Sequence, residues 1–199
     1  MNRRFAWIAA AIVLAAPLAA SAKPNPDPSA LPAGDYVADE AHASLTVKVP
    51  HGFSTYTFRF DIVDASFTYD PKNPEASKIT ARIPLYSMST GYRRADILFP
   101  NFMAGAAKTA TVAFTSTAIQ RSSPNVGKIT GAITLNGVTK PVVLDTTYNG
   151  SGAYFQDKLR LGFSATTVIK RSDFGLTQFL ADVGDDLTVN IEIEFLPKK

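Results

Sequence analysis

From about Leu45 to the C-terminus, apolar and polar residues alternate in one run after another. One run has an apolar face made of Tyr56, Phe58, Phe60 and Ile62, with polar residues between them. Similar apolar sets recur at Ile79/Ala81/Ile83, Ile129/Gly131/Ile133/Leu135, Leu159/Leu161/Phe163/Ala165 and Leu187/Val189/Ile191/Ile193. A period of two is typical of strands with one buried and one solvated face. Repeated over a whole domain, it predicts a sandwich or a barrel.

The turn residues between these runs indicate eight strands. We expect them at 42–49, 55–69 (long and kinked), 77–85, 110–120, 127–135, 140–149, 157–168 and 186–196. Asn136-Gly137 is a tight hairpin signal, and further turn clusters lie at 70–74, 122–125 and 149–152. Short hairpin links favour an antiparallel sheet, and closure into a barrel removes exposed strand edges. The predicted fold class is therefore all-β, an eight-stranded antiparallel barrel.

Two long segments, 87–109 and 170–186, break the alternation and mix paired basic residues with aromatic and aliphatic ones. In the first segment, Leu98, Phe102 and Met103 could share one side of a short helix. Long irregular links in a compact domain are usually lids or binding loops. Alternatively, their apolar side chains plug one end of the barrel while the charges form surface pairs. The sequence leaves lid and plug equally open.

The first 22 residues have the organisation of a secretory signal peptide. A basic stretch, Asn2-Arg3-Arg4, precedes an apolar run over 5–18, and Ala20-Ser21-Ala22 forms an A-x-A cleavage site. That apolar run is short for a membrane anchor, which needs roughly 20 residues. We therefore expect cleavage after Ala22 and a periplasmic or secreted protein. Residues 23–34 contain four prolines and are expected to be a flexible leader before the barrel domain at 35–199.

Charge and cysteine content narrow the function classes. The net charge is +3, and removal of the signal peptide leaves 18 basic against 17 acidic side chains. A nearly neutral surface without a basic stripe argues against a nucleic-acid partner. The chain has no cysteine, which excludes thiol catalysis, thiolate metal sites and disulfides. No stretch after the signal peptide is apolar enough to cross a membrane, so stable membrane insertion is not expected.

Few residues are candidates for catalysis or metal binding. Asp39, His42 and Ser44 superficially suggest a hydrolase triad, but residues three apart on a strand point to opposite faces. A structural role for His42 is favoured. A metal site formed by His42, His51 and one carboxylate has no ligand-spacing motif behind it. We therefore predict no catalytic residue, no metal, no cofactor and no enzymatic activity.

The remaining feature is the predicted interior. The aromatic residues on the apolar faces are Phe58, Phe60, Phe67, Tyr69, Phe114, Tyr148 and Phe163. Eight-stranded barrels are either filled by side chains or hold one small ligand. An aromatic-lined tunnel suits a long, thin apolar ligand, because burial contributes about 25 cal/mol per Å² of apolar area. The alternation alone leaves a filled core and a hollow tunnel open.

Four stretches resemble the YceI-like family. They are Tyr36-x-x-Asp39-x-x-His42-x-Ser44, Phe114-Thr115-Ser116, Gly131-x-Ile133-x-Leu135-x-Gly137-Val138-Thr139-Lys140-Pro141-Val142 and Ile169-Lys170-Arg171-Ser172-Asp173-Phe174-Gly175-Leu176. The match runs in order through essentially the whole chain after the signal peptide. Proteins of this family are similar to lipocalins: they are extended antiparallel barrels, often periplasmic, that bind a polyisoprenoid or quinone-type lipid in an internal tunnel. The resemblance implies the same fold and role here.

One loop departs from the family's pattern. Where the family has an adjacent Arg-Asp pair, this chain has Arg94-Ala95-Asp96. Asn101-Phe102-Met103 replaces an acidic residue and an aromatic pair, and Ala104-Gly105-Ala106-Ala107 follows without the family's proline. Because this loop is one of the two candidate lids, the resemblance leaves its ligand contacts undefined.

Together, the interior, the loops and the resemblance predict an exported, non-enzymatic carrier of a long apolar isoprenoid-type lipid. The residues expected to line the tunnel are Phe58, Phe60, Phe67, Ile83, Phe114, Leu161 and Phe163. Phe102 and Phe174 are expected to cover a mouth of the tunnel. The basic residues expected near the polar head are Arg94 and Arg171, whose alternative role is ion pairing with Asp96 and Asp173.

Two other function classes stay open at this point. A filled barrel that acts as a stress-response interaction module needs no cavity. A lipid-acting hydrolase or isomerase, which is less favoured, needs His42 as its base. The sequence also leaves a homodimer open.

Overall fold

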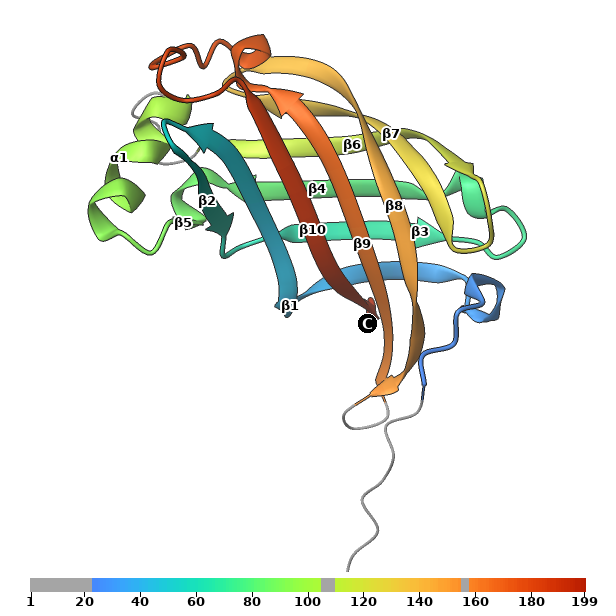
Figure 1. Ribbon diagram of the computed structural model, residues 1–199. Coiled ribbons are helices and arrows are strands. Elements are labelled where there is room, and N and C mark those ends of the chain that lie inside the picture. Colours follow the sequence, from blue (N-terminus) through green and yellow to red (C-terminus); the bar gives the residue numbers. More distant parts are fainter. Residues whose placement is uncertain (1–22, 105–109, 155–157) are drawn as a thin grey trace, which may run out of the picture.

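The computed structural model describes residues 23–104, 110–154 and 158–199, without the side chains of 100–104 and of Tyr154 (Figure 1). The strands are β1 Gly34–His51, β2 Ser54–Phe60, β3 Asp64–Tyr69, β4 Lys78–Pro84, β5 Met88–Ser89, β6 Thr111–Arg121, β7 Val126–Leu135, β8 Val138–Tyr154, β9 Lys158–Lys170 and β10 Asp186–Pro197. The helix α1 spans Arg93–Ala104, and the 3₁₀ helices are η1 Pro28–Ala30, η2 Pro74–Ala76, η3 Leu85–Ser87 and η4 Arg171–Phe174.

Eight of the strands close into an antiparallel barrel, as the alternation predicts. β10, β9, β8, β7, β6, β4, β3 and β1 pair in that order, and β1 also pairs with β10, which completes the ring. The short strands β2 and β5 extend the sheet beside the second half of β1. Apolar side chains of alternate positions face the inside of the ring, where they form a single core cluster.

Strand β1 is much longer than the predicted 42–49, and it pairs with three strands. Its first residues, Gly34–Val37, pair with β3, whereas Leu45–His51 pair with β2. Its other edge pairs with β10 on both sides of a register shift between Ala38 and Ala43. The predicted strand at 55–69 is therefore two strands, because its halves pair with different parts of β1.

The hairpin between β7 and β8 is confirmed, and the predicted hairpin at 149–152 is wrong. Asn136 and Gly137 have positive φ angles of 52° and 73°, as a tight hairpin requires. β8 instead continues through 149–152 to Tyr154, with a register shift between Tyr148 and Gly150. Gly150 has a φ of 123°, and a Cβ there would lie 2.7 Å from the Cβ of Pro24. The glycine signal thus reflects a close approach of two segments and not a turn.

Residues 23–34, predicted to be a flexible leader, pack against the barrel. We call residues 24–32 the N-terminal strap. Asn25 and Ser151 exchange two backbone hydrogen bonds of 2.7 and 2.9 Å, which adds a bridge to the edge of β8. Pro28 and Leu31 are buried. Prolines have no backbone N–H to donate to a β-ladder, so the strap is held by a few separate contacts. Such contacts leave no alternation of apolar and polar residues in the sequence.

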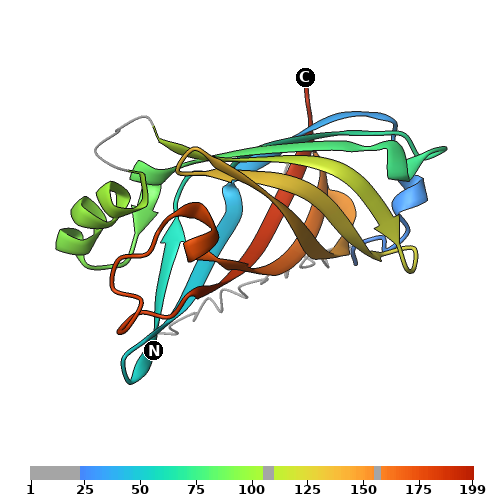
Figure 2. The same cartoon turned by 90° about the horizontal axis from the view of Figure 1, so that it is seen from above.

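The barrel has two distinct ends (Figures 1 and 2). Helix α1, the β1–β2 turn and the loop after η4 lie at one end, which we call the helix end. Helix η1 and the β3–β4 and β6–β7 turns lie at the other, the turn end. Both long interruptions of the alternation thus lie at the helix end, and α1 confirms the short helix expected in the first. Within the described ranges, no helix is both long and apolar enough to cross a bilayer.

Removing the hydroxyl of Tyr36 tests the attachment of the strap. Tyr36 is 2% exposed, and its hydroxyl donates a 2.7 Å hydrogen bond to the Pro32 carbonyl. We expect Tyr36→Phe to lower the free energy of unfolding by about 1 kcal/mol, the usual contribution of one such bond. Urea unfolding measures the change. Tyr86→Phe is the control, because Tyr86 is 63% exposed and its loss should change stability by less than about 0.5 kcal/mol.

Candidate functional site

A cavity of about 270 Å³ lies inside the barrel and reaches its turn end. The walls are the inward faces of most strands of the ring, with side chains such as Ile83, Phe114 and Phe163. Phe114 can lie there because its ring extends over Gly131 of β7, two residues from its pairing partner Ile133, where a Cβ would be 2.4 Å from the ring. At the turn end, the lining includes residues of the β3–β4 and β6–β7 turns, such as Pro74 and Pro124.

The exposure of the inner wall indicates that this space is hollow. Ile79, Ile129 and Leu144 face inward and line the cavity, yet each keeps an intermediate exposure to solvent. In a filled barrel, such apolar residues would be fully buried against one another. The volume is close to the lower end of the usual range for ligand pockets, about 300–1,000 Å³. The inner wall can therefore accept an apolar molecule without first opening the core.

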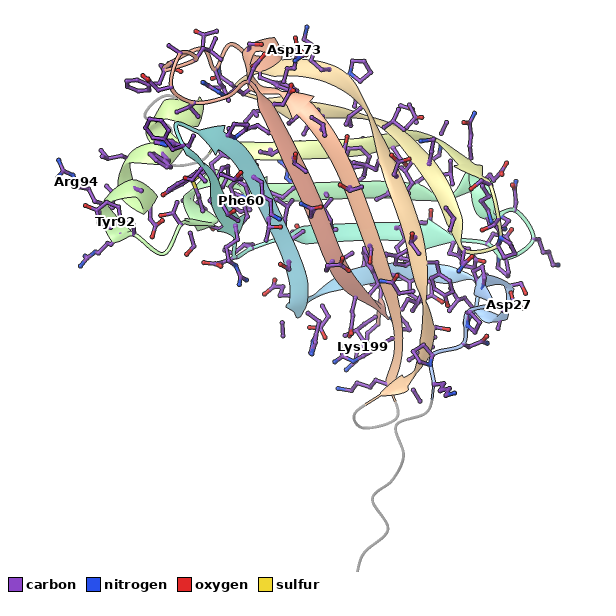
Figure 3. The ribbon with its side chains drawn as sticks, in the orientation of Figure 1. Asp27, Phe60, Tyr92, Arg94, Asp173 and Lys199 are labelled. Carbon is purple, nitrogen blue, oxygen red and sulfur yellow. The ribbon has the colours of Figure 1, made fainter. Side chains whose placement is uncertain are left out.

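A second cavity of about 60 Å³ lies toward the helix end. The two cavities share six lining residues: Leu45, Ile83, Val112, Ile133, Ile169 and Val189. The aromatic side chains of Phe58 and Phe60, both on β2, line the smaller one (Figure 3 labels Phe60). The hollow space thus extends along the barrel and narrows toward the helix end.

Six of the seven residues predicted to line a tunnel border one of the two cavities. Phe67, Ile83, Phe114 and Phe163 line the larger one, and Phe58, Phe60 and again Ile83 line the smaller one. Leu161 lines neither cavity; it pairs with Ser151 of β8 and is completely buried in the core. The binding role of these residues stays a prediction.

Aromatic rings form the wall of the larger cavity near the strap. Phe67 stacks on Tyr36 with a centroid separation of 5.0 Å, and its edge contacts involve Phe195 at 4.9 Å and Phe163 at 5.9 Å. Phe163 also lies 5.3 Å from Tyr148. Edge-to-face aromatic pairs of this kind add stability beyond their buried area. This cluster gives the cavity a rigid, apolar wall.

The helix end is closed by the second interruption, which acts as a plug and not as an open lid. Phe174 is 2% exposed, Leu176 is also buried, and neither borders a cavity. The carbonyl of Phe174 accepts a 3.0 Å hydrogen bond from the Asn136 side chain, which joins η4 to the β7–β8 hairpin. Phe174 therefore packs into the core at the end of the barrel, and its predicted place over a tunnel mouth stays a prediction.

Arg171 is not near a polar mouth, contrary to the prediction. Its guanidinium donates four hydrogen bonds of 2.6–2.9 Å to the backbone carbonyls of Leu176, Gln178, Val183 and Gly184. This buried side chain satisfies the carbonyls of an irregular loop, and that use of its donors leaves no ion pair with Asp173 among the described contacts. The sequence showed a basic residue but not the loop that folds around it.

The predicted residues of the first interruption do not form a mouth either. Arg94 is exposed on α1 and points away from the barrel (Figure 3). Its predicted partner, Asp96, instead accepts hydrogen bonds from the backbone nitrogen and hydroxyl of Thr90 at 2.6 and 2.7 Å. The side chain of Phe102 lies outside the described part of the structure.

Several polar residues at the turn end were absent from the predicted site, among them Arg121 and Tyr148. Arg121 and Tyr148 both line the larger cavity. Tyr148 follows the inward alternation of β8, and it was visible as an interior aromatic residue. Arg121 was not, because a register shift between Ser116 and Ala118 moves the inward positions of β6 from even to odd numbers. Ile119 and Arg121 then face inward together.

A charged cluster lies on the outside of the barrel, across β1, β9 and β10. His42 Nδ1 lies 2.9 Å from a carboxylate oxygen of Asp39, and the Arg160 guanidinium donates to Asp39 and, at 2.9 Å, to Glu194. The expectation that Asp39 and His42 point apart is wrong, because both residues lie within the register shift of β1 between Ala38 and Ala43, where the regular alternation is interrupted. Ser44 takes part in no hydrogen bond with His42 among the described residues. The cluster is therefore an ion-pair network and not a triad.

This network does not favour a metal. Ligand atoms of Asp39, His42 and Glu194 lie within 4.8 Å of one another, but the Arg160 guanidinium already lies among them. Burial alone would raise the pKa of Asp39, and the hydrogen bonds from Arg160 and His42 outweigh it, so that the pKa falls below its ordinary value. His51, the other predicted ligand, lies at the far end of β1, against Val183.

The Arg160 network makes a testable contribution to stability. We expect Arg160→Gln to lower the free energy of unfolding by about 2 kcal/mol, since it removes charge-assisted bonds from a largely buried carboxylate. Because folding holds the Asp39 pKa below 3.8, this contribution is fully present above that pH and is lost as the pH falls through the lowered value. Urea unfolding at neutral and acidic pH measures both effects.

The control for this experiment is Lys128→Gln. Lys128 pairs with Asp145 on an exposed face, where both side chains are more than half accessible. Lys128→Gln should lower the free energy of unfolding by less than about 1 kcal/mol. An equal decrease in the free energy of unfolding for Arg160→Gln and Lys128→Gln at neutral pH would contradict the larger contribution assigned to the Arg160 network.

Known proteins are similar to this chain along most of its length. The profile of the YceI-like domain matches residues 36–195. A UPF0312 protein from Shewanella sp. strain ANA-3 is 34% identical over 176 residues, which cover 86% of this chain and 92% of that protein. A UPF0312 protein from Ectopseudomonas mendocina strain ymp is 34% identical over 167 residues, covering 81% and 87%.

Solved structures share the fold. The Campylobacter jejuni YceI protein has a TM-score of 0.67 and 29% identity, with 74% of this chain and 88% of that protein covered. A polyisoprenoid-binding domain from Saccharophagus degradans, implicated in plant cell wall breakdown, has a TM-score of 0.58 and 16% identity, covering 82% and 98%. The family profile, the relatives and the closed barrel agree with the resemblance found in the sequence. The chain therefore belongs to the YceI-like family.

Proposed function

We propose that this protein binds a long apolar lipid of the isoprenoid type, a polyisoprenoid or a quinone, inside its barrel and carries it outside the cytoplasm. The observation that carries the proposal is the hollow, almost wholly apolar interior. Closed barrels of eight strands are just wide enough to hold one slender ligand, and burial of apolar area supplies the binding free energy. The binding named for the Saccharophagus degradans domain, which shares the fold, supports the same ligand class.

The cavity argues against the two alternatives. A filled barrel that acts only through its surface does not need an inner wall accessible to solvent. A lipid hydrolase or isomerase with His42 as its base needs that imidazole at the ligand, whereas His42 is exposed on the outside of the sheet, bonded to Asp39. A base there cannot reach an atom inside the barrel. We therefore propose a binding protein without catalytic activity.

Native mass spectrometry after mild purification, followed by lipid extraction, tests the proposal. We expect an added mass that corresponds to an isoprenoid lipid, or its uptake from vesicles that contain one. A protein that never carries or takes up such a lipid would contradict the proposal.

A matched pair of substitutions locates the binding site. Ala165 lines the cavity, whereas Ala132 lies on a regular part of β7 and borders neither cavity. We expect Ala165→Phe to weaken the binding of farnesol at least tenfold, because the phenyl ring occupies the space in which the ligand would bury its apolar surface. We expect Ala132→Phe to change the affinity by less than about twofold, because that side chain lies outside both cavities. Displacement of a fluorescent fatty probe measures both. Equal effects would place the lipid outside the barrel.

Export is a separate part of the proposal, and it rests on residues 1–22. We expect the protein expressed in a Gram-negative host to be recovered from the periplasmic fraction, with a mass that corresponds to cleavage after Ala22. An uncleaved chain in the cytoplasmic fraction would contradict export without affecting lipid binding.

A further inference from the structure

Most of the polar side chains that line the larger cavity lie near its turn end; Thr167, which pairs with Val189, is an exception. Tyr69, Arg121, Asn125 and Tyr148 line it near the turn end, whereas the walls shared with the smaller cavity are wholly apolar. In a ligand pocket, a few polar groups fix the orientation of a molecule whose burial supplies most of the affinity. The position of these groups therefore distinguishes the two ends of any lipid in the barrel.

Tyr148 has a buried hydroxyl without a partner. The residue is 5% exposed, and no hydrogen-bonding atom of the described residues satisfies its hydroxyl. Burial raises the pKa of Tyr148, and the Ser151 side chain, which lies near the hydroxyl but outside hydrogen-bond geometry, opposes that rise only in part, so the phenol stays protonated and able to donate. Buried polar groups in folded proteins nearly always have a hydrogen-bond partner. A buried hydroxyl without one therefore indicates a site for a ligand atom that accepts a hydrogen bond.

Two other tyrosines near the strap, unlike Tyr148, have hydroxyls with hydrogen-bond partners. The Tyr36 hydroxyl donates to the Pro32 carbonyl, and the Tyr69 hydroxyl donates to the Pro28 carbonyl at 2.8 Å. Both belong to the contacts that hold the N-terminal strap. Tyr148 also borders the strap region, yet the strap offers it no acceptor. Its hydroxyl is therefore not explained by the attachment of the strap.

Arg121 supplies a second donor at the same end. It is exposed at the end of β6, and one of its nitrogen atoms donates a 2.8 Å bond to the Pro124 carbonyl. Arg121 and Tyr148 line the same cavity, and the Arg121 guanidinium opposes part of the rise that burial gives to the pKa of Tyr69, the tyrosine beside it. A guanidinium has five N–H donors, so several directions remain for an oxygen of a ligand.

We propose that Tyr148 and Arg121 form a head-group subsite for a lipid whose head carries a hydrogen-bond-accepting oxygen. The inference rests on the proposed function and adds an orientation to it. The head lies at the turn end, and the tail runs toward Phe58 and Phe60 in the smaller cavity. The carbonyl of a quinone, the hydroxyl of an isoprenoid alcohol and the oxygen of a prenyl phosphate share this chemistry, because each accepts from a phenol or a guanidinium.

The opposite orientation has less support. A head at the helix end would need donors there, but Arg171 donates to four backbone carbonyls of its own loop. Arg94 points away from the barrel, at the end opposite Asp27 of the strap (Figure 3). Neither arginine lines either of the two described cavities.

Binding of ligands that differ in their heads tests the subsite. The probes are farnesol, farnesyl phosphate and the headless hydrocarbon squalene, measured by displacement of a fluorescent fatty probe from the full chain without its signal peptide. We expect Tyr148→Phe and Arg121→Gln each to weaken farnesol or farnesyl phosphate at least fivefold and to leave squalene within twofold. If Arg121→Gln loses more affinity for farnesyl phosphate than Tyr148→Phe loses for farnesol, the subsite prefers an anionic head group. The reverse result indicates a neutral head group.

Stability separates this role from a structural one. Tyr148→Phe removes an unpaired hydroxyl, so its melting temperature without ligand should equal or exceed that of the wild type. Tyr36→Phe, which removes a paired hydroxyl, should melt lower and bind all three probes as before. A loss of stability in Tyr148→Phe together with unchanged affinities would assign that hydroxyl to the fold.

The remaining outcomes also decide between the proposals. Weaker binding in Arg94→Gln, with Arg121→Gln and Tyr148→Phe unchanged, would overturn the orientation and place the head at the helix end. Binding that is insensitive to every one of these variants would overturn the subsite and leave the lipid-binding proposal intact. A wild-type protein that binds none of the probes, nor any isoprenoid lipid from vesicles, would overturn both.

Discussion

The closure of the sheet between β1 and β10 is the constraint on which the rest of this structure depends. One edge of β1 pairs with β10, while its other edge pairs first with β3 and then with β2. Without this double use of β1, the ring of eight strands would have two open edges, and unpaired backbone groups would face solvent. Closure also forces every alternate side chain of each strand into one enclosed volume, so the size of those side chains decides whether the inside is filled.

The inside is not filled, and the reason is where the large residues lie. Aromatic rings crowd around Phe67 near the strap, and Phe174 and Leu176 close the helix end. Between these regions, the walls carry mostly isoleucine, valine and alanine, which are too short to meet across a ring of eight strands. The result is a space with packed ends and a hollow middle. Such a space fits a slender apolar molecule far better than a compact one.

The two ends differ in what they do with polar groups. At the helix end, Arg171 satisfies the carbonyls of an irregular loop, and Asp96 caps the turn before α1. The polar atoms there are used by the fold. At the turn end, two tyrosine hydroxyls hold the strap, but the Tyr148 hydroxyl is buried without a partner. This asymmetry gives the barrel a direction, which a carrier needs if it is to present the same end of its lipid each time.

The period-two alternation and the Asn136-Gly137 turn were sufficient to predict a closed antiparallel barrel of eight strands, because both depend on local backbone geometry. The motifs named the family, and most of the predicted wall residues do border the cavities. Tertiary structure alone decided the split of 55–69, the packing of the prolines at 24–32, the hydrogen bonds of Arg171 and the inward position of Arg121. Each of these depends on a partner far away in the chain or on a bulge that shifts the inward face by one residue. A local pattern carries no information about such a partner, so the sequence determined that there is an inside, and the fold decided which end of it is polar.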